Sequence, residues 1–232
     1  MKDTLEILYE DNHVIAVNKK SSDIVQGDKT GDITLPDRIK EYLKEKYQKP
    51  GNVFCGVIHR LDRPTSGVVL FAKTSKGLER LNKQFRDKET NKVYWAVTGN
   101  EPSTKNGTLI NYLKKNEGQN KSYVHSTEVP GSKKAILNYK VIASSDNYFL
   151  LEIQLETGRH HQIRAQLSSI GCPIKGDVKY GAKRPNKDLS ISLHARELSF
   201  MHPTTKEQIS ITAPVPEDPL WKYFTQELNC NQ

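Results

Sequence analysis

The sequence predicts an α+β fold with a mixed, largely antiparallel central sheet and flanking helices. Short β-like runs outnumber helical patterns, and the two kinds do not alternate regularly along the chain. Regular alternation would indicate a parallel, doubly wound sheet, so its absence favours antiparallel pairing. The 232 residues suffice for one large domain or two small lobes. The chain has no internal repeat, heptad pattern or low-complexity linker, and we expect residues 1–232 to form a single domain.

The first third of the chain predicts a strand pair and a helix. Residues 5–9 and 14–18 are apolar runs on either side of a polar turn, which is typical of a hairpin. Residues 19–33 form a polar loop. A helix is then expected to begin near Pro36, because apolar residues recur every four positions and would form one buried stripe. That stripe consists of Leu35, Ile39, Leu43 and Tyr47.

The middle of the chain continues with a buried strand at residues 68–71 and a helix with Ser75 as its N-cap. Leu78, Leu81 and Phe85 give that helix an apolar face. The remaining expected strands are 93–98, 108–113, 123–127, 135–143 and 148–155.

The last third predicts a short helix, a hairpin and a closing helix. The helix covers residues 160–170 and ends at Gly171. Residues 190–201 and 208–213 could pair as a hairpin, and residues 219–228 form the closing helix. The polar stretch 114–134 is expected to be an exposed loop, with an extended hairpin or a mobile arm as alternatives.

The charge indicates an anionic partner. The chain has 35 Lys and Arg against 27 Asp and Glu, so its formal net charge is +8. This sign favours nucleic acid first and a membrane surface second, although a merely basic soluble enzyme has the same composition.

The cysteines and the termini indicate a reduced, cytoplasmic protein. Cys55, Cys172 and Cys230 are odd in number and have no CxxC spacing, so we expect neither a disulfide framework nor a zinc knuckle. The N-terminus has no apolar signal core, and no later segment is apolar enough to span a bilayer. We therefore expect no membrane partner.

The segment HRLDRPTSG at residues 59–67 is the most informative motif. It places the carboxylate of Asp62 between Arg60 and Arg63, directly before a buried strand. A single acid held there suits a nucleophile or an anion-handling site. A solvated surface loop is the alternative on charge pattern alone.

Two further groupings carry polar side chains. In KVYW at residues 92–95, the alternation of a strand places Tyr94 opposite its apolar neighbours, although a strand tyrosine is usually an ordinary core residue. In TGRHHQIR at residues 157–164, His160 and Arg164 would share a helix face. A buried guanidinium needs an anion, and Asp62 is an attractive partner, whether the pair is functional or purely structural.

No motif indicates a metal or a cofactor. His160 and His161 are adjacent, and adjacent residues on a helix point about 100° apart, so they rarely chelate together. The chain has no HExxH, no phosphate-binding or dinucleotide glycine motif, and no GxSxG around Ser66. We expect neither a cofactor nor a bound metal.

Taken together, these segments resemble the RluA-type family of RNA pseudouridine synthases. Residues 59–67 match its HRLDxxTSG signature, and residues 92–94 are similar to its tyrosine motif. Residues 157–164, followed by GCPI at 171–174 and Gly176-Asp177, resemble its TGRxHQIR…GxPIxGD block. Residues 193–203 and 213–214 resemble its closing strands, so the likeness runs from about residue 5 to about residue 216.

The resemblance implies a pseudouridine synthase fold with a basic catalytic cleft that isomerises uridine in RNA. Asp62 would be the nucleophile, Tyr94 would stack on the uracil and assist proton removal from carbon 5, and Arg164 would pair with Asp62. Arg60 would enter the RNA stack that the target base leaves. Further RNA contacts are expected from His59, Arg63, Arg159 and His160.

Many members of that family also carry a small N-terminal RNA-binding domain, whereas we expect residues 1–232 to be a single catalytic domain without one, acting as a monomer on ribosomal or transfer RNA. The chain departs from the family at residues 18–25, where Lys20 replaces the usual Pro and Ser22 the usual Gly. A catalytically silent RNA-binding or assembly protein on the same fold is the alternative function. A metal-dependent nuclease is remote, because clustered carboxylates are lacking.

Overall fold

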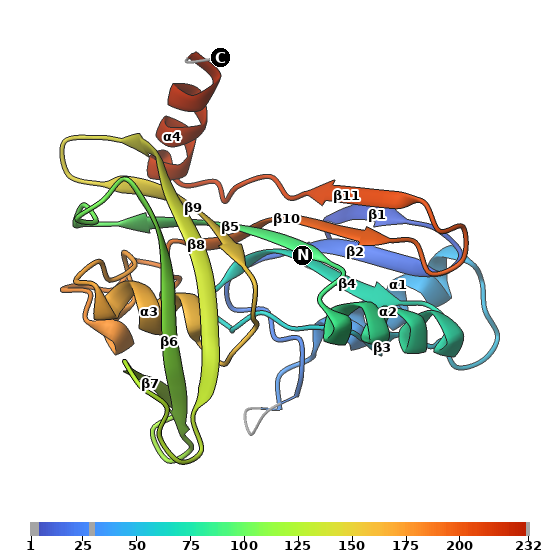
Figure 1. Ribbon diagram of the computed structural model, residues 1–232. Coiled ribbons are helices and arrows are strands. Elements are labelled where there is room, and N and C mark those ends of the chain that lie inside the picture. Colours follow the sequence, from blue (N-terminus) through green and yellow to red (C-terminus); the bar gives the residue numbers. More distant parts are fainter. Residues whose placement is uncertain (1–4, 28–30, 231–232) are drawn as a thin grey trace. The chain divides into compact units, whose positions relative to one another are not determined.

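The computed structural model describes residues 5–27 and 31–230, and these form two compact units (Figure 1). The first unit contains the chain up to Asn91 together with Ala195–Pro214, and the second contains Lys92–His194 and the chain from Val215 onward. The strand β10 (Leu193–Met201) leads from the second unit into the first. The α+β class predicted from the sequence is confirmed.

The first unit is built on a sheet with the strand order β1 (Ile7–Glu10), β2 (Val14–Lys19), β4 (Ser66–Ala72) and β10. Both predicted hairpins are confirmed, because β1 pairs antiparallel with β2 and β10 pairs antiparallel with β11 (Gln208–Thr212). The short β3 (Gly56–Val57) pairs with β4. All seven residues of β4 are buried, so the strand lies in the interior of this unit.

Two helices belong to the first unit, and each corrects a detail of the prediction. In α1 (Leu35–Lys46) the predicted stripe is buried except for Tyr47, which follows the helix and is 46% exposed. In α2 (Ser75–Asp87) the N-cap is Thr74 and not Ser75. The Thr74 backbone is still extended, and its hydroxyl accepts the Gly77 amide at 3.0 Å, as a capping side chain does.

The second unit has a sheet with the order β5, β9, β8, β6 and β7, and successive strands pair antiparallel. The strands are β5 (Asn91–Thr98), β9 (Phe149–Leu155), β8 (Lys133–Ser144), β6 (Asn106–Asn116) and β7 (Lys121–His125). The preferred expectation of an exposed loop at residues 114–134 was wrong, and the alternative of an extended hairpin is confirmed, because much of this stretch belongs to the β6–β7 hairpin. Leu113 pairs with Val124 there, and both pack in a cluster that buries one face of the hairpin.

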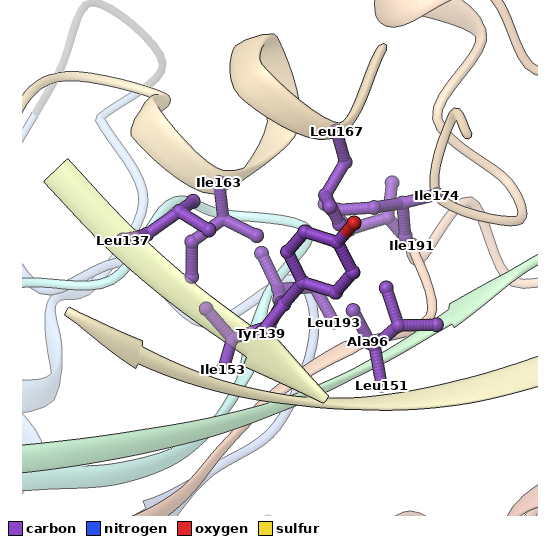
Figure 2. Packing of buried hydrophobic residues seen from close by; sticks show 10 residues of the cluster. All are labelled: Ala96, Leu137, Tyr139, Leu151, Ile153, Ile163, Leu167, Ile174, Ile191 and Leu193. Atoms are coloured by element: carbon purple, nitrogen blue, oxygen red, sulfur yellow. The ribbon is translucent and has the colours of Figure 1, made fainter. Parts of the chain in front are cut away.

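The helices of the second unit cover opposite faces of its sheet. Ile163 and Leu167 of α3 (Gln162–Ser169) pack on Ala96, Leu151 and other apolar residues, as Figure 2 shows. On the other face, strand β5 contributes Val93, Trp95 and Val97, which pack against α4 (Pro219–Cys230). The predicted alternation of β5 is confirmed, since Tyr94 packs with the α3 cluster.

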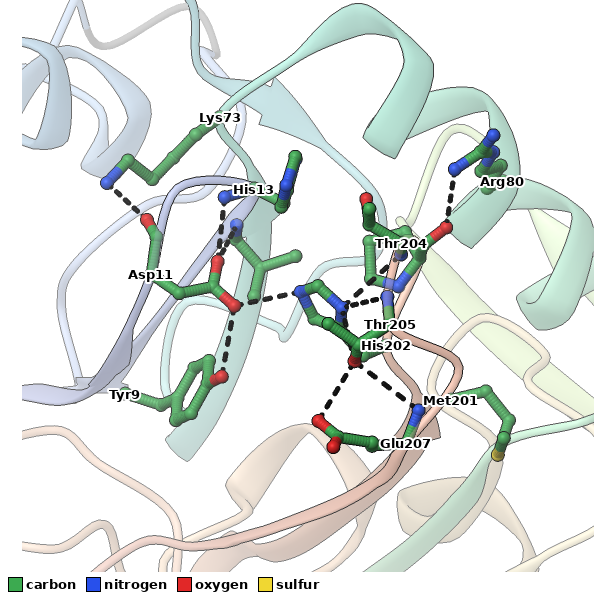
Figure 3. A network of polar contacts seen from close by, with 12 residues as sticks. Tyr9, Asp11, His13, Lys73, Arg80, Met201, His202, Thr204, Thr205 and Glu207 are labelled. Atoms are coloured by element: carbon green, nitrogen blue, oxygen red, sulfur yellow. Dashed lines mark hydrogen bonds and ion pairs between the residues drawn. The ribbon is translucent and has the colours of Figure 1, made fainter.

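A polar network ties the turns of the first unit together (Figure 3). The Asp11 carboxylate accepts the amides of His13 and Val14 at 2.7 and 2.8 Å. The buried His202 ring lies 2.8 Å from Asp11 through Nε2, and its Nδ1 accepts the Thr205 amide at 2.9 Å. These bonds join the β1–β2 turn to the β10–β11 turn, so the two hairpins hold each other in place.

Glu10 is the second anchor of this unit. Its carboxylate accepts bonds from Lys46 at 2.7 Å and Lys73 at 2.8 Å, and from the hydroxyls of Tyr42 and Tyr47. Burial favours a higher pKa for Glu10, but these four bonds outweigh it and lower the pKa to about 2. Because the pKa is lowered on folding, the carboxylate stabilises the fold above the ordinary pKa of about 4.5.

We expect that stabilisation to disappear as the pH falls from about 4.5 to about 2. Replacing Glu10→Gln should lower the free energy of unfolding at pH 7 by about 1–3 kcal/mol and flatten its decline in this window. Urea unfolding at a series of pH values measures both effects. Glu41→Gln, an exposed acid on α1, is the control. An unchanged acid limb in Glu10→Gln would contradict this assignment.

Candidate active site

The loop that carries Asp62 is held from behind by a buried lysine. Lys19 is fully buried at the end of β2, and its ammonium donates to three backbone carbonyls: Lys20 and Arg63 at 3.0 Å and Thr65 at 2.7 Å. An ammonium has three hydrogens, so these three oxygens satisfy it completely. Two of them, those of Arg63 and Thr65, closely follow Asp62 in sequence, and the backbone on the C-terminal side of the acid is therefore fixed.

The electrostatics of Lys19 depend on the same loop. Burial lowers the pKa of Lys19 to about 8, while the negative charges of Asp23 and Asp62 act in the opposite direction. The protonated form still predominates at neutral pH. Lys19 thus places a positive charge in contact with the backbone carbonyls of the Asp62 loop.

Other residues of the HRLDRPTSG segment also have structural roles. Gly67 has φ +118°, and a Cβ there would lie 2.3 Å from the Ala195 carbonyl oxygen, so only glycine fits. The His59 ring stacks on Phe85 at 4.9 Å, and its Nε2 accepts the Leu70 amide at 3.0 Å. The ring of His59 therefore supports β4 and α2, and its predicted contact with RNA stays a prediction.

The two arginines of this segment are exposed. Arg60 donates to Gln26 at 2.6 Å, and Arg63 forms an ion pair with Asp32 at 2.7 Å. An exposed ion pair is worth little and exchanges easily, so both guanidinium groups can reach a polyanion. Asp62 between them is half-buried.

The unusual loop after β2 keeps a backbone that normally requires glycine. Ser22, where the resemblance noted above would place Gly, has φ +79°, and its amide donates to the Arg63 carbonyl at 3.0 Å. Lys20, where the resemblance would place Pro, uses its amide to donate to Asp23 at 3.3 Å. The Ser22 amide therefore bonds this loop to the Asp62 loop, while Ser22 itself adopts a strained backbone conformation.

The second unit carries the predicted tyrosine. Tyr94 is half-buried on the α3 side of β5. Lys92 lies two residues earlier on the same face of the strand, and burial lowers the pKa of its ammonium.

The second unit also carries Arg164, which the structure pairs with a residue that the sequence analysis did not single out. Its Nε and Nη2 donate to the two oxygens of Asp177 at 2.7 and 2.9 Å, and both side chains are buried. The Tyr180 ring lies 5.1 Å from the guanidinium carbon. The pair predicted between Arg164 and Asp62 would join the two units, and it stays a prediction.

The helix begins later than predicted, which changes the position of His160. Because α3 starts at Gln162, His160 precedes it, and the expectation that His160 and Arg164 share a helix face was wrong. His161 is the N-cap and has φ 52°. The two imidazoles stack at 3.7 Å, His160 contacts Ser122 at 2.9 Å, and His161 contacts the Tyr180 hydroxyl at 3.0 Å.

Arg159 is exposed beside these histidines. Its Nε donates to the Lys134 carbonyl at 2.9 Å, which leaves the guanidinium at the surface.

Among residues 5–27 and 31–230, no group of three His, Cys, Asp or Glu side chains is arranged as metal ligands. None of the helices in the same residues is long and apolar enough to cross a membrane.

Few signals in the sequence pointed to structural roles for Lys19 and Asp177. Lys19 ends an apolar strand and looks like a solvated residue at a strand terminus. Asp177 lies in the matched GD dipeptide, but nothing in its surroundings indicates burial. Only tertiary contacts reveal the role of these two charged residues. Lys19 bonds to a carbonyl 44 residues away in the chain, and Asp177 bonds to a guanidinium 13 residues away.

Comparisons with known proteins agree with these motifs. The family model of RNA pseudouridylate synthase matches residues 13–169. The RNA pseudouridine synthase YhcT of Bacillus subtilis is 36% identical over 222 residues, which cover 92% of this chain and 70% of that protein. The ribosomal large subunit pseudouridine synthase D of Zymomonas mobilis is 33% identical, with 92% and 70% covered.

The fold has a relative among solved structures. Human RNA Pseudouridylate Synthase Domain Containing 4 superposes with a TM-score of 0.78 at 22% identity, covering 97% of this chain and 93% of that one. The match of the family model, the identity of the bacterial relatives and the motifs in both units lead to one conclusion: this chain belongs to the RNA pseudouridylate synthase family.

Proposed function

We propose that this chain isomerises uridine to pseudouridine in structured RNA, with Asp62 as the nucleophile and no cofactor. The observation that carries the proposal is the Asp62 loop, whose backbone is fixed by the buried ammonium of Lys19. A preorganised carboxylate can react without reorganising its surroundings. The name of the Zymomonas mobilis relative favours ribosomal RNA over transfer RNA as the substrate.

The proposed reaction breaks the bond between C1′ of the ribose and N1 of the uracil, and it forms a bond from C1′ to C5. Asp62 assists departure of the base, either by attack on the sugar or by helping a glycal to form. After the base has turned and C5 has bonded to C1′, Tyr94 assists removal of the C5 proton, and N1 gains a proton. No electrons are gained or lost overall.

In the proposal both units act as one catalytic domain over residues 1–232. Arg164 would pair with Asp62, and Arg60 would enter the gap left by the extruded base. Arg63, Arg159 and His160 would bind the RNA backbone, in line with the net charge of +8. Because ribosomal RNA is the proposed substrate, the cytoplasm is the proposed compartment, and the enzyme would act there as a monomer.

The isomerisation can be tested by tritium release from RNA labelled at carbon 5 of uridine, because the new bond to C1′ displaces that hydrogen. We expect Asp62→Ala to reduce release to background while RNA affinity falls only modestly. Asp87→Asn, an exposed acid on α2, should match the parent. Circular dichroism of each variant shows whether the fold persists.

A parent protein that binds RNA but releases no tritium would favour the catalytically silent RNA-binding alternative. Tritium release by Asp62→Ala at the parent rate would exclude Asp62 as the nucleophile. The two results differ, because the first concerns the activity and the second concerns the residue.

The Lys19→Met variant should show what the buried ammonium does. It loses three bonds to loop carbonyls, so we expect the free energy of unfolding to fall by about 2–4 kcal/mol and tritium release to slow on the order of 10²-fold. Lys83→Met removes an exposed ammonium on α2 and is the control. Parent-like melting and turnover in Lys19→Met would refute the role of Lys19 in fixing the loop.

The Asp177→Asn variant tests whether Arg164 must be held in place. It leaves a buried guanidinium without its anion, so stability should fall by about 3–5 kcal/mol at most, and turnover should fall more than RNA affinity. Thermal unfolding, turnover and RNA binding are measured together. Asp188→Asn, whose carboxylate bonds only to Ser190 among the contacts described, is the control in the same unit. Equal turnover in the parent and Asp177→Asn would contradict the proposed role of Arg164.

A further inference from the structure

We propose that the outer face of the β6–β7 hairpin and the adjoining start of β8 bind single-stranded RNA through stacked bases and backbone phosphates. This inference rests on the proposal that RNA is the substrate. We call this surface the hairpin platform, and it consists of Tyr112, Lys114, Lys121, Tyr123, His125 and Lys134.

The two faces of the hairpin differ because side chains alternate along a strand. Leu113 and Ala135 are buried in a cluster with Ala165 of α3 and Tyr180, and Val124 packs against it. Ser122 on β7 is also buried, with its hydroxyl near His160. One face of the hairpin is thus closed, and the platform residues belong to the opposite face.

The strand register brings aromatic and basic residues together on that face. Tyr112 lies opposite His125 on β7 and Lys134 on β8, and Lys114 lies opposite Tyr123. Side chains directly opposite in an antiparallel pair are close neighbours. Each tyrosine ring therefore has a lysine directly opposite it, and Tyr112 also has the His125 ring as a neighbour.

Tyr123 is the ring best placed to receive a base. It is 42% exposed, and its hydroxyl donates to Gln119, which anchors the ring at the end of the hairpin. The Lys121 ammonium lies 5.6 Å from the centroid of the Tyr123 ring and 5.1 Å from that of the buried Tyr180. An anchored, exposed ring loses little freedom when a base stacks on it, and the neighbouring cation can bind the phosphate of the same nucleotide.

The charge of the platform favours a polyanion. Three of its six residues are lysines and none is acidic. The acid in the hairpin turn, Glu117, is paired with Lys115 at 2.6 Å, and Lys115 lies opposite the buried Ser122 and not among the platform residues. An acidic peptide would satisfy the lysines but would leave the rings without a role, whereas single-stranded RNA uses both.

Fluorescence anisotropy with two labelled probes of equal length tests the platform. One probe is a short oligouridine, and the other has the same backbone with abasic sites. Tyr123→Ala should weaken oligouridine binding about fivefold or more and leave the abasic probe unchanged. Lys114→Gln should weaken binding of both probes and reduce the salt dependence of log K by about 0.7.

Matched controls exist on α4. Tyr223→Ala removes a tyrosine that is 39% exposed, and Lys222→Gln removes an exposed ammonium. Both should bind the probes like the parent. If Tyr123→Ala lost affinity for both probes equally, the ring would not act by stacking on a base, and the proposed stacking platform would be overturned. Failure of the parent to bind oligouridine, or parent-like binding by Tyr123→Ala and Lys114→Gln, would also overturn it.

Tritium release separates this inference from the proposed function. If the parent releases tritium and Tyr123→Ala binds oligouridine normally, the platform is wrong and the isomerase proposal stands. If Tyr123→Ala loses oligouridine affinity but the parent releases no tritium, the platform stands and the isomerase proposal is wrong.

Discussion

Arg164 and Asp177 lie almost entirely out of water and hold each other through two bonds of 2.7 and 2.9 Å. Neither charge could be buried alone, because removing an ion from water costs several kcal/mol unless a partner replaces the solvent. The pair therefore couples the start of α3 to the segment after it. Tyr180, whose ring lies beside the guanidinium, extends this coupling to β7 through its hydroxyl, which accepts the Ser122 amide.

The same constraint governs the first unit, where the partners are backbone carbonyls. The ammonium of Lys19 is satisfied by three oxygens of the chain, and the loop carrying Asp62 is fixed as a result. Glu10 and Asp11 carry the opposite charge, and the carboxylate of each accepts hydrogen bonds from donors on several elements. Buried charge thus holds the loops in place, while the apolar clusters hold the strands and helices.

In the second unit, the two faces of the sheet contact different parts of the structure. One face packs on α3 and the other on α4, so Tyr94 and Trp95 on the same strand enter different clusters. At the hairpin end, the inner face closes over α3, and the outer face carries the exposed ring of Tyr123 together with lysines. Strand alternation alone produces this division, without any additional element.

The sequence by itself determined the α+β class, the order of most elements, the faces of β5 and the family, because these follow from local periodicity and from contiguous motifs. Single-residue details at helix starts were missed at Ser75 and His160, since capping depends on backbone geometry that neighbouring residues decide. For residues 114–134 an exposed loop was preferred to the extended hairpin, because the polar outer face of β6 and β7 conceals the alternation. Only the tertiary structure decided that Lys19 and Asp177 are buried, because the oxygens and the guanidinium that make their burial possible come from distant parts of the chain.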